Sequence, residues 1–114
     1  MSNPRTPLVV GSVTAQPGTR ATGLVPLDLG GDARVDVPLA LVHGALPGPR
    51  VAVTAGIHGA EYVSIAALRQ VILGLDPAEV RGSIVAVLTA SPAAFAARSI
   101  YVNPLDGRNL NRCF

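Results

Sequence analysis

The sequence contains no lysine and no tryptophan, and it has only one cysteine and two histidines. All nine basic residues are arginines, and they are scattered along the chain rather than clustered. With two Phe and two Tyr there is also little to stack on bases, so we find no footprint of a nucleic-acid-binding protein. The single cysteine, Cys113, excludes an internal disulfide and gives no argument for secretion.

Long apolar runs are missing as well. No stretch approaches the ~18 apolar residues of a membrane span. The N-terminal stretch MSNPRTPLVVGSVTAQPG has one Arg and a short apolar run that glycine and polar residues interrupt, which makes a poor signal peptide. We therefore expect a cytoplasmic protein that does not associate with membranes.

What the chain does contain is apolar surface. Of its 114 residues 49% are hydrophobic and 14% are charged, so it can build the core of one domain and is not a disordered tail. Twelve glycines and ten prolines predict many turns and short elements. We expect a single unit, with a β-rich lead-in over residues 1–48 and an α/β part over residues 49–114.

Alternating apolar and polar positions predict strands in the first part of the chain. These strands are expected over residues 7–14, 21–29 and 35–43. The last two should form a hairpin around the turn at 30–32. Pro26 and Pro38 remove backbone donors, so their strands should lie at a sheet edge or carry bulges. A tight, rigid loop is expected over 44–49.

The second part of the chain alternates between strands and helices. The β-prone run 50–56 predicts a strand buried on both faces, and apolar residues at steps of three and four predict a helix over 61–75. After a short capped turn at 76–79, a second buried strand is expected over 82–91. A Ser-Pro pair should then cap a short helix over 93–97. This succession favours an α/β fold in which a helix connects two parallel strands. The apolar face of the long helix would consist of Ile65, Leu68, Val71, Ile72 and Leu75.

One histidine and one glutamate occur three residues apart in the stretch TAGIHGAEY. Both lie between the predicted strand and helix, at the sheet edge where open α/β sheets bind ligands. Imidazole and carboxylate are ligands of zinc, and His58 and Glu61 can converge on one ion across such a turn. Alternatively, His58 bonds a carbonyl and Glu61 favours the helix N-terminus. For an isolated H-x-x-E pattern the second interpretation is the commoner one.

The C-terminal stretch RSIYVNPLDGRNLNRCF is rich in Asn and Arg. The planar fork of Arg pairs with a carboxylate, and Asn adds neutral donors and acceptors, so the stretch suits a small anionic substrate. The alternative is a solvated loop, since NPLDG is a good turn sequence. The residues in question are Arg98, Asn103, Arg108, Asn109, Asn111 and Arg112.

Taken together, GIHGAEY and the later NPLDGRNLNRCF resemble the succinylglutamate desuccinylase/aspartoacylase family of zinc-carboxypeptidase-like hydrolases. The resemblance covers most of the chain from about Val35 onward, including VPLALVHGALPGPRVAVTAG. It implies an incomplete zinc-carboxypeptidase-like α/β fold, in which a β-hairpin region leads into a partial mixed sheet with a crossover helix. The implied reaction is hydrolysis of an N-acyl amino acid by water that zinc and a glutamate base activate.

The resemblance also implies roles for individual residues. His58 and Glu61 match two of the family's three zinc ligands. Asn111 and Arg112 match the pair that holds the substrate carboxylate. Arg98 matches the catalytic arginine that polarises the scissile carbonyl. Zinc is the implied cofactor, and a small anionic N-acyl amino acid is the implied substrate.

The chain departs from the family pattern after Phe114, because the family takes its third ligand, a histidine, and its catalytic glutamate from later segments. His43 precedes the motif and is expected to be a strand-end residue bonded locally, while Glu79 fits a helix start. We therefore expect the N-terminal portion of a deacylase, inactive by itself, whose two buried strands lack neighbours and leave an exposed sheet edge. The alternative is a truncated, non-catalytic domain that binds metal weakly or associates with a partner.

Overall fold

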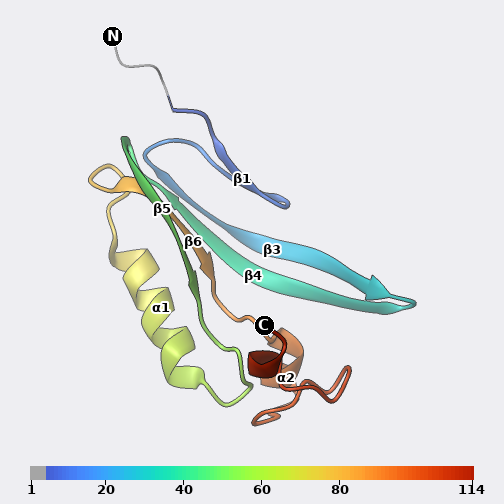
Figure 1. Cartoon of the computed structure of the whole chain (residues 1–114). Coiled ribbons are helices and arrows are strands. Elements are labelled where there is room, and N and C mark those ends of the chain that lie inside the picture. Colours follow the sequence, from blue (N-terminus) through green and yellow to red (C-terminus); the bar gives the residue numbers. More distant parts are fainter. Residues whose placement is uncertain (1–4) are drawn as a thin grey trace.

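The computed structural model describes residues 5–114, and a four-stranded mixed sheet forms its centre (Figure 1). In spatial order β3-β4-β6-β5, the β3–β4 and β4–β6 pairs are antiparallel, whereas β5 and β6 are parallel. The predicted α/β fold, with a hairpin that leads into a parallel pair, is confirmed. The four strands are β3 (Thr19–Gly30), β4 (Ala33–His43), β5 (Leu46–Thr54) and β6 (Arg81–Val87).

The predicted first strand is a small hairpin instead. Strands β1 (Leu8–Val10) and β2 (Val13–Ala15) pair antiparallel. Between them Gly11 has a φ of 56°, a left-handed conformation that glycine adopts without steric cost, so the chain reverses there. The hairpin packs on one face of the sheet, where the buried residues are Leu8, Val13, Ala15, Leu39 and Leu41.

Helix α1 (Tyr62–Gly74) covers the opposite face of the sheet and connects β5 to β6 (Figure 1). Leu68 and Ile72 are buried against Ala40, Val42 and Ala86 of the sheet. Sheet residues facing the helix thus alternate with those facing the hairpin, as the pleat of a strand requires.

One residue of the predicted helix face is placed differently. Val71 is 56% exposed, so its assignment to the buried face is wrong. The sheet contacts only the line of side chains that Ile65, Leu68 and Ile72 form along the helix. Val71 lies beside this line, and within the described residues no element packs over it.

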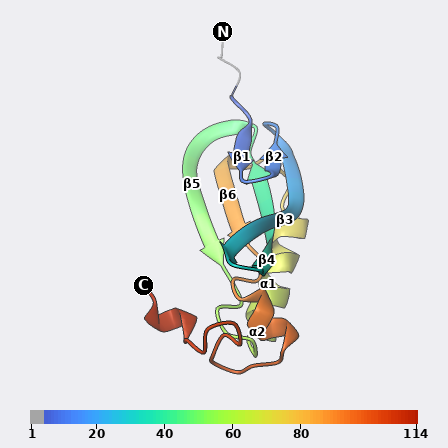
Figure 2. The same ribbon diagram turned by 90° about the vertical axis from the view of Figure 1, so that its right-hand side faces the viewer.

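The two strands predicted to be buried differ from each other. β6 lies between β4 and β5, and Ser83 and Ala86 are buried. β5 is an edge strand (Figure 2), and Val51 and Val53 are 48% and 36% exposed. The prediction of a strand buried on both faces is therefore wrong for β5, because within residues 5–114 no strand pairs with its outer side. Of the two strands expected to lack neighbours, only β5 lies at an edge of the four-stranded sheet, whereas β6 has a partner on each side.

Proline affects the sheet less than the sequence suggested. Pro26 lies on the edge strand β3, as predicted. Pro38 lies on the interior strand β4, but β6 pairs with β4 only from Leu39 to His43, so no ladder bond requires its missing donor. The prediction of a loop over 44–49 is wrong from Leu46 onward, where β5 starts, because a register shift between Leu46 and Arg50 accommodates the prolines within the strand.

The remaining elements are short. The Asp76 carboxylate accepts a hydrogen bond from the Ala78 N–H and caps the turn before β6, as expected. Helix α2 (Pro92–Ala96) begins with Pro92, although the preceding serine makes no side-chain cap. The chain ends in a 3₁₀ turn, η1 (Leu110–Arg112). In the part of the chain that the structure describes, no helix has the length and apolarity to cross a membrane.

Candidate metal and substrate site

The loop between β5 and α1 carries His58 and Glu61 to the carboxyl end of β5. Two glycines permit its path. Gly56 has a φ of 69° and turns the chain out of the strand. Gly59 is buried, and a Cβ at this position would overlap the carbonyl oxygens of Ala94 and Ser99. The loop therefore packs directly against the end of α2, which also starts the C-terminal segment.

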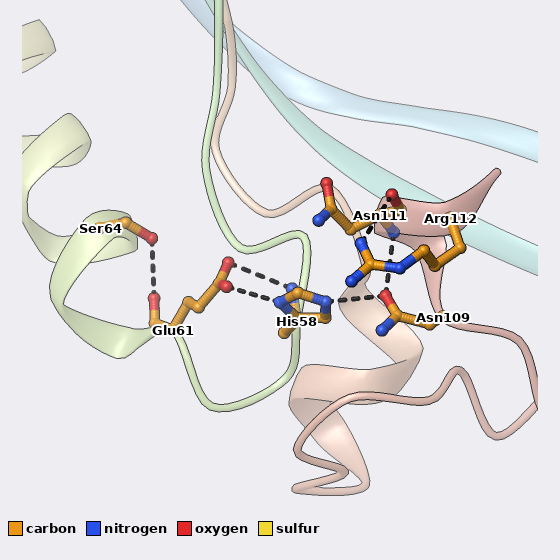
Figure 3. Close-up of polar contacts among 6 residues, drawn as sticks. All are labelled: His58, Glu61, Ser64, Asn109, Asn111 and Arg112. Carbon is orange, nitrogen blue, oxygen red and sulfur yellow. Dashed lines mark hydrogen bonds and ion pairs between the residues drawn. The ribbon is translucent and has the colours of Figure 1, made fainter. Parts of the chain in front are cut away.

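His58 and Glu61 are bonded to each other (Figure 3). The His58 Nδ1 lies 2.7 Å from Glu61 Oε2, and the His58 backbone N–H donates to Oε1 over 3.2 Å. Glu61 occupies the N-cap position of α1 but makes no side-chain bond to the helix. Its carboxylate is thus directed at the histidine and makes no hydrogen bond to the helix backbone, while its place at the N-cap still fits the alternative interpretation that Glu61 favours the helix N-terminus.

Asn109 bonds the other ring nitrogen of His58. Its Oδ1 lies 2.8 Å from Nε2 and also accepts the Asn111 backbone N–H over 3.0 Å. A backbone N–H only donates, so the amide atom facing Asn111 must be oxygen, and His58 Nε2 must carry a proton. With Nε2 protonated, the lone pair of a neutral His58 lies on Nδ1, opposite the Glu61 carboxylate. These two acceptors need a shared cation, either a proton or a metal ion.

The electrostatics of the pair agree with this arrangement. The hydrogen bond to Asn109, followed by the one to Glu61, raises the pKa of His58, while desolvation and the charge of Arg112 oppose the rise. The hydrogen bond from the His58 side chain lowers the pKa of the Glu61 carboxyl. Both shifts favour an imidazolium–carboxylate pair when no metal is bound.

The Asn-rich C-terminal segment folds through side-chain turns. The Asn103 Oδ1 accepts from the Leu105 N–H, the Asp106 Oδ1 accepts from the Arg108 N–H, and both distances are 2.9 Å. The Asn103 N–H also donates to the Arg108 carbonyl over 2.7 Å and closes the loop. Such turns are the ordinary use of Asn and Asp in loops. The loop interpretation thus describes Asn103 and Asp106, whereas Asn109 both makes a turn and binds His58.

The proposed substrate residues differ in whether they are seen beside this cluster. Asn111 and Arg112 belong to η1 and lie beside the His58–Asn109 contact (Figure 3). Arg98 follows α2 with a φ of 56°, and its backbone N–H bonds the Phe95 carbonyl. Within the described residues, no side-chain hydrogen bond or ion pair joins Arg98 to His58 or its partners.

Two residues near His58 were not predicted to have a role there. In the sequence, Asn109 was recognised only as one of several polar residues of the segment. Its position two residues before Asn111 permits an Asx turn, and this spacing could have singled it out. Tyr101 stands edge-on to the His58 ring, with centroids 5.5 Å apart and planes at 83°. Nothing in the sequence indicated this contact, because it depends on how the loop folds back.

The residues present fit part of a zinc site. An imidazole nitrogen and a carboxylate oxygen that face each other are two ligands of the kind zinc takes. Within residues 5–114 no group of three His, Cys, Asp or Glu side chains gathers around a common point. His43 ends β4, as expected, but its partners are the Ser83 hydroxyl and the Thr6 carbonyl, which are distant in sequence. The expectation of local bonding is therefore wrong.

Comparison with known proteins assigns the chain to a family. The profile of the succinylglutamate desuccinylase/aspartoacylase catalytic domain matches residues 47–114. The N-alpha-acetyl-L-2,4-diaminobutyric acid deacetylase of Halomonas elongata is 37% identical over 81 residues, which make up 70% of this chain and 23% of that protein.

Solved structures agree with this match. The succinylglutamate desuccinylase/aspartoacylase from Rhodobacter sphaeroides superposes with a TM-score of 0.73 at 30% identity, covering 83% of this chain and 30% of that one. The product-bound ectoine utilization protein EutE (DoeB) from Ruegeria pomeroyi gives a TM-score of 0.73 at 27% identity, covering 100% and 34%. This chain thus corresponds to 34% or less of the length of these three relatives. It belongs to the succinylglutamate desuccinylase/aspartoacylase family.

Proposed function

We propose that this chain forms part of a zinc-dependent deacylase that hydrolyses the amide bond of an N-acyl amino acid. The observation that carries the proposal is the contact of His58 with Glu61 and Asn109 at the carboxyl end of β5. The relatives support the reaction class, since the protein from Halomonas elongata is named a deacetylase of an acetylated diamino acid.

In this proposal His58 and Glu61 are two protein ligands of the zinc ion. Zinc supplies a Lewis acid that polarises an acyl carbonyl and makes a water molecule more acidic. Catalytic zinc normally has three protein ligands, so a further ligand is required in addition to the residues described.

Asn109 orients His58 for this task. Its Oδ1 holds the proton on Nε2, which leaves the Nδ1 lone pair on the side of Glu61. Hydrogen bonds of this kind to the second nitrogen of a ligating histidine fix the ring and its tautomer. The Asx turn to Asn111 holds the amide oxygen in place.

Asn111 and Arg112 are proposed to bind the substrate carboxylate. Arg112 lies close enough to His58 to oppose its protonation, so an anion bound to the guanidinium would lie beside the metal ligands. A planar guanidinium can pair with both carboxylate oxygens at once. We retain Arg98 as the proposed catalytic residue that polarises the scissile carbonyl; in this role its side chain would turn toward the bound substrate.

A second candidate function is non-catalytic. The exposed edge of β5, with Val51 and Val53 at the surface, favours association with another protein segment, because unpaired strand edges are templates for pairing. In that case the His58–Glu61 pair would bind metal weakly and turn over no substrate.

Amine release from a panel of N-acylated amino acids tests the proposal. The polypeptide of residues 1–114 should show no turnover above buffer, with or without zinc, since a positioned general base alone contributes ~10²–10⁴ in rate. A protein that carries these residues together with the rest of the family's catalytic domain should be active and sensitive to chelators. Zinc-dependent turnover by the short polypeptide would contradict the incomplete site, and inactivity of the longer protein would favour the non-catalytic function.

A further inference from the structure

A concave site lies away from His58, between α1 and the β3–β4 hairpin. Its volume is about 380 Å³, which falls within the ~300–1,000 Å³ typical of small-molecule sites. Helix α1 contributes Ile65, Ile72 and Leu73 to one wall, and Ala40 lies on the sheet opposite. The groove shares no lining residue with the His58 cluster.

The charge of this groove has one sign. Arg69 is the only charged residue in the lining that the structure describes, and no Asp or Glu takes part. Within residues 5–114 Arg69 forms no salt bridge. The ion pair found in this range joins His58 to Glu61. Thr22 and Thr89 add hydroxyl groups to the otherwise aliphatic lining. An apolar groove with one unpaired guanidinium is complementary to an apolar anion.

The groove is held open by a contact at the end of α1. The guanidinium of Arg20, on β3, donates to the carbonyls of Ile72, Leu73 and Leu75 over 3.2, 3.2 and 3.0 Å. The last turn of the helix has no basic residue of its own, so Arg20 supplies the missing partner for its free carbonyls. Helix and hairpin are thus fixed to each other at this end, as expected of a largely pre-formed site.

We propose that this groove binds a monocarboxylate with an aliphatic tail. The tail lies against Ile65, Ile72 and Leu73, where its burial removes apolar surface of both partners from water. The carboxylate pairs with the Arg69 guanidinium in a charge-assisted hydrogen bond. The argument uses neither the metal ligands nor the deacylase activity, so the site stands whether or not the proposed function does.

Titration with decanoate tests the site. Decanoate, kept below the concentration at which it forms micelles, is added to the metal-free 114-residue protein in a calorimeter. We expect saturable one-to-one binding and about tenfold weaker binding by Arg69→Gln, the size of one lost charge-assisted hydrogen bond. Arg81→Gln is the matched control, because Arg81 is exposed on β6 and does not line the groove; it should bind like the parent. Decan-1-ol, with the same tail and no charge, should bind as weakly as decanoate binds to Arg69→Gln.

Three results would overturn the proposal. One is equal affinity of the parent and Arg69→Gln for decanoate, with matching far-UV circular dichroism spectra. Another is equal affinity of the parent for decanoate and decan-1-ol. The third is a dimer in sedimentation analysis that excludes decanoate, because a second copy of the chain would then cover the groove.

Discussion

The two histidines lie at opposite ends of the same sheet, and each bonds through both ring nitrogens. His43 pairs with Ser83 near the start of β6, whereas His58 follows the carboxyl end of β5. His43 is 2% exposed. The Thr6 carbonyl accepts from its Nε2–H, and the Ser83 hydroxyl donates to its Nδ1. A neutral ring satisfies this arrangement completely.

His58 has the same number of ring bonds but a different pair of partners. The Asn109 carbonyl oxygen accepts from Nε2, and a carboxylate oxygen of Glu61 faces Nδ1. The side chain is 16% exposed and thus accessible to solvent. Because the proton of a neutral His58 lies on Nε2, the carboxylate opposite Nδ1 needs a second proton or a metal ion there, whereas a hydroxyl can donate its own hydrogen. In our proposal, the partners and accessibility of a histidine, more than its hydrogen-bond count, distinguish the proposed ligand His58 from the structural residue His43.

The largest expected difference between the two histidines is in how much each contributes to the free energy of unfolding, which substitution by alanine measures. His43→Ala leaves a buried cavity and removes the partners of Ser83 and Thr6, so it should lower the free energy of unfolding by about 2–4 kcal/mol. His58→Ala, at a solvent-accessible loop, should lower it much less. Denaturant unfolding of both variants with a common slope measures the difference. Similar losses from the two variants would mean that His58 is a structural residue as well.

The sequence predicted the fold where periodicity is long and regular. The hairpin expected at 21–29 and 35–43 is found as Thr19–Gly30 and Ala33–His43, and the helix expected at 61–75 is found as Tyr62–Gly74. Prediction from the sequence was wrong where burial depends on which strands pair in space. The apolar run of β5 is typical of a central strand, but within residues 5–114 β5 lies at the edge of the sheet.

The same limit applies to the candidate site. Two residues on one tight turn, His58 and Glu61, were recognisable from their spacing, because three residues span such a turn. The contact between His58 and Asn109 joins segments far apart in the chain and depends on the loop closed by Asn103. Long-range contacts of this kind leave no periodic signal in one sequence. The bonds of His43 to Ser83 and Thr6 were missed for the same reason.

Removal of the Asn109 amide should lower the zinc affinity of the proposed His58 site. Asn109→Ala frees the Nε2 side of His58, so the ring loses its fixed tautomer and orientation. We expect zinc affinity to fall by about 10–100-fold, the usual effect of losing the outer hydrogen bond of a ligating histidine. Asn109→Asp keeps an acceptor oxygen and serves as the control. Competition with a zinc-sensitive dye gives the affinities, and unchanged binding by Asn109→Ala would exclude the orienting role.

Arg112→Lys should give a smaller effect, limited to substrate. A lysine keeps the positive charge but cannot pair with both carboxylate oxygens, so KM should rise roughly tenfold or less while kcat changes little. Steady-state kinetics must be measured on a protein that carries these residues within the complete catalytic domain. An unchanged KM would show that Arg112 does not anchor the carboxylate. Zinc affinity should stay the same, which separates this residue from Asn109.

The central claim is that His58, and not His43, belongs to a metal site. Zinc titration followed by the ring resonances of both histidines in one NMR sample of the 114-residue protein tests it most directly. We predict that the His58 signals move or broaden as zinc is added and that the change saturates, while the His43 signals stay in place, because its ring nitrogens are already bonded in the buried core. His58 signals that remain unchanged at saturating zinc, or His43 signals that change in their place, would contradict the account.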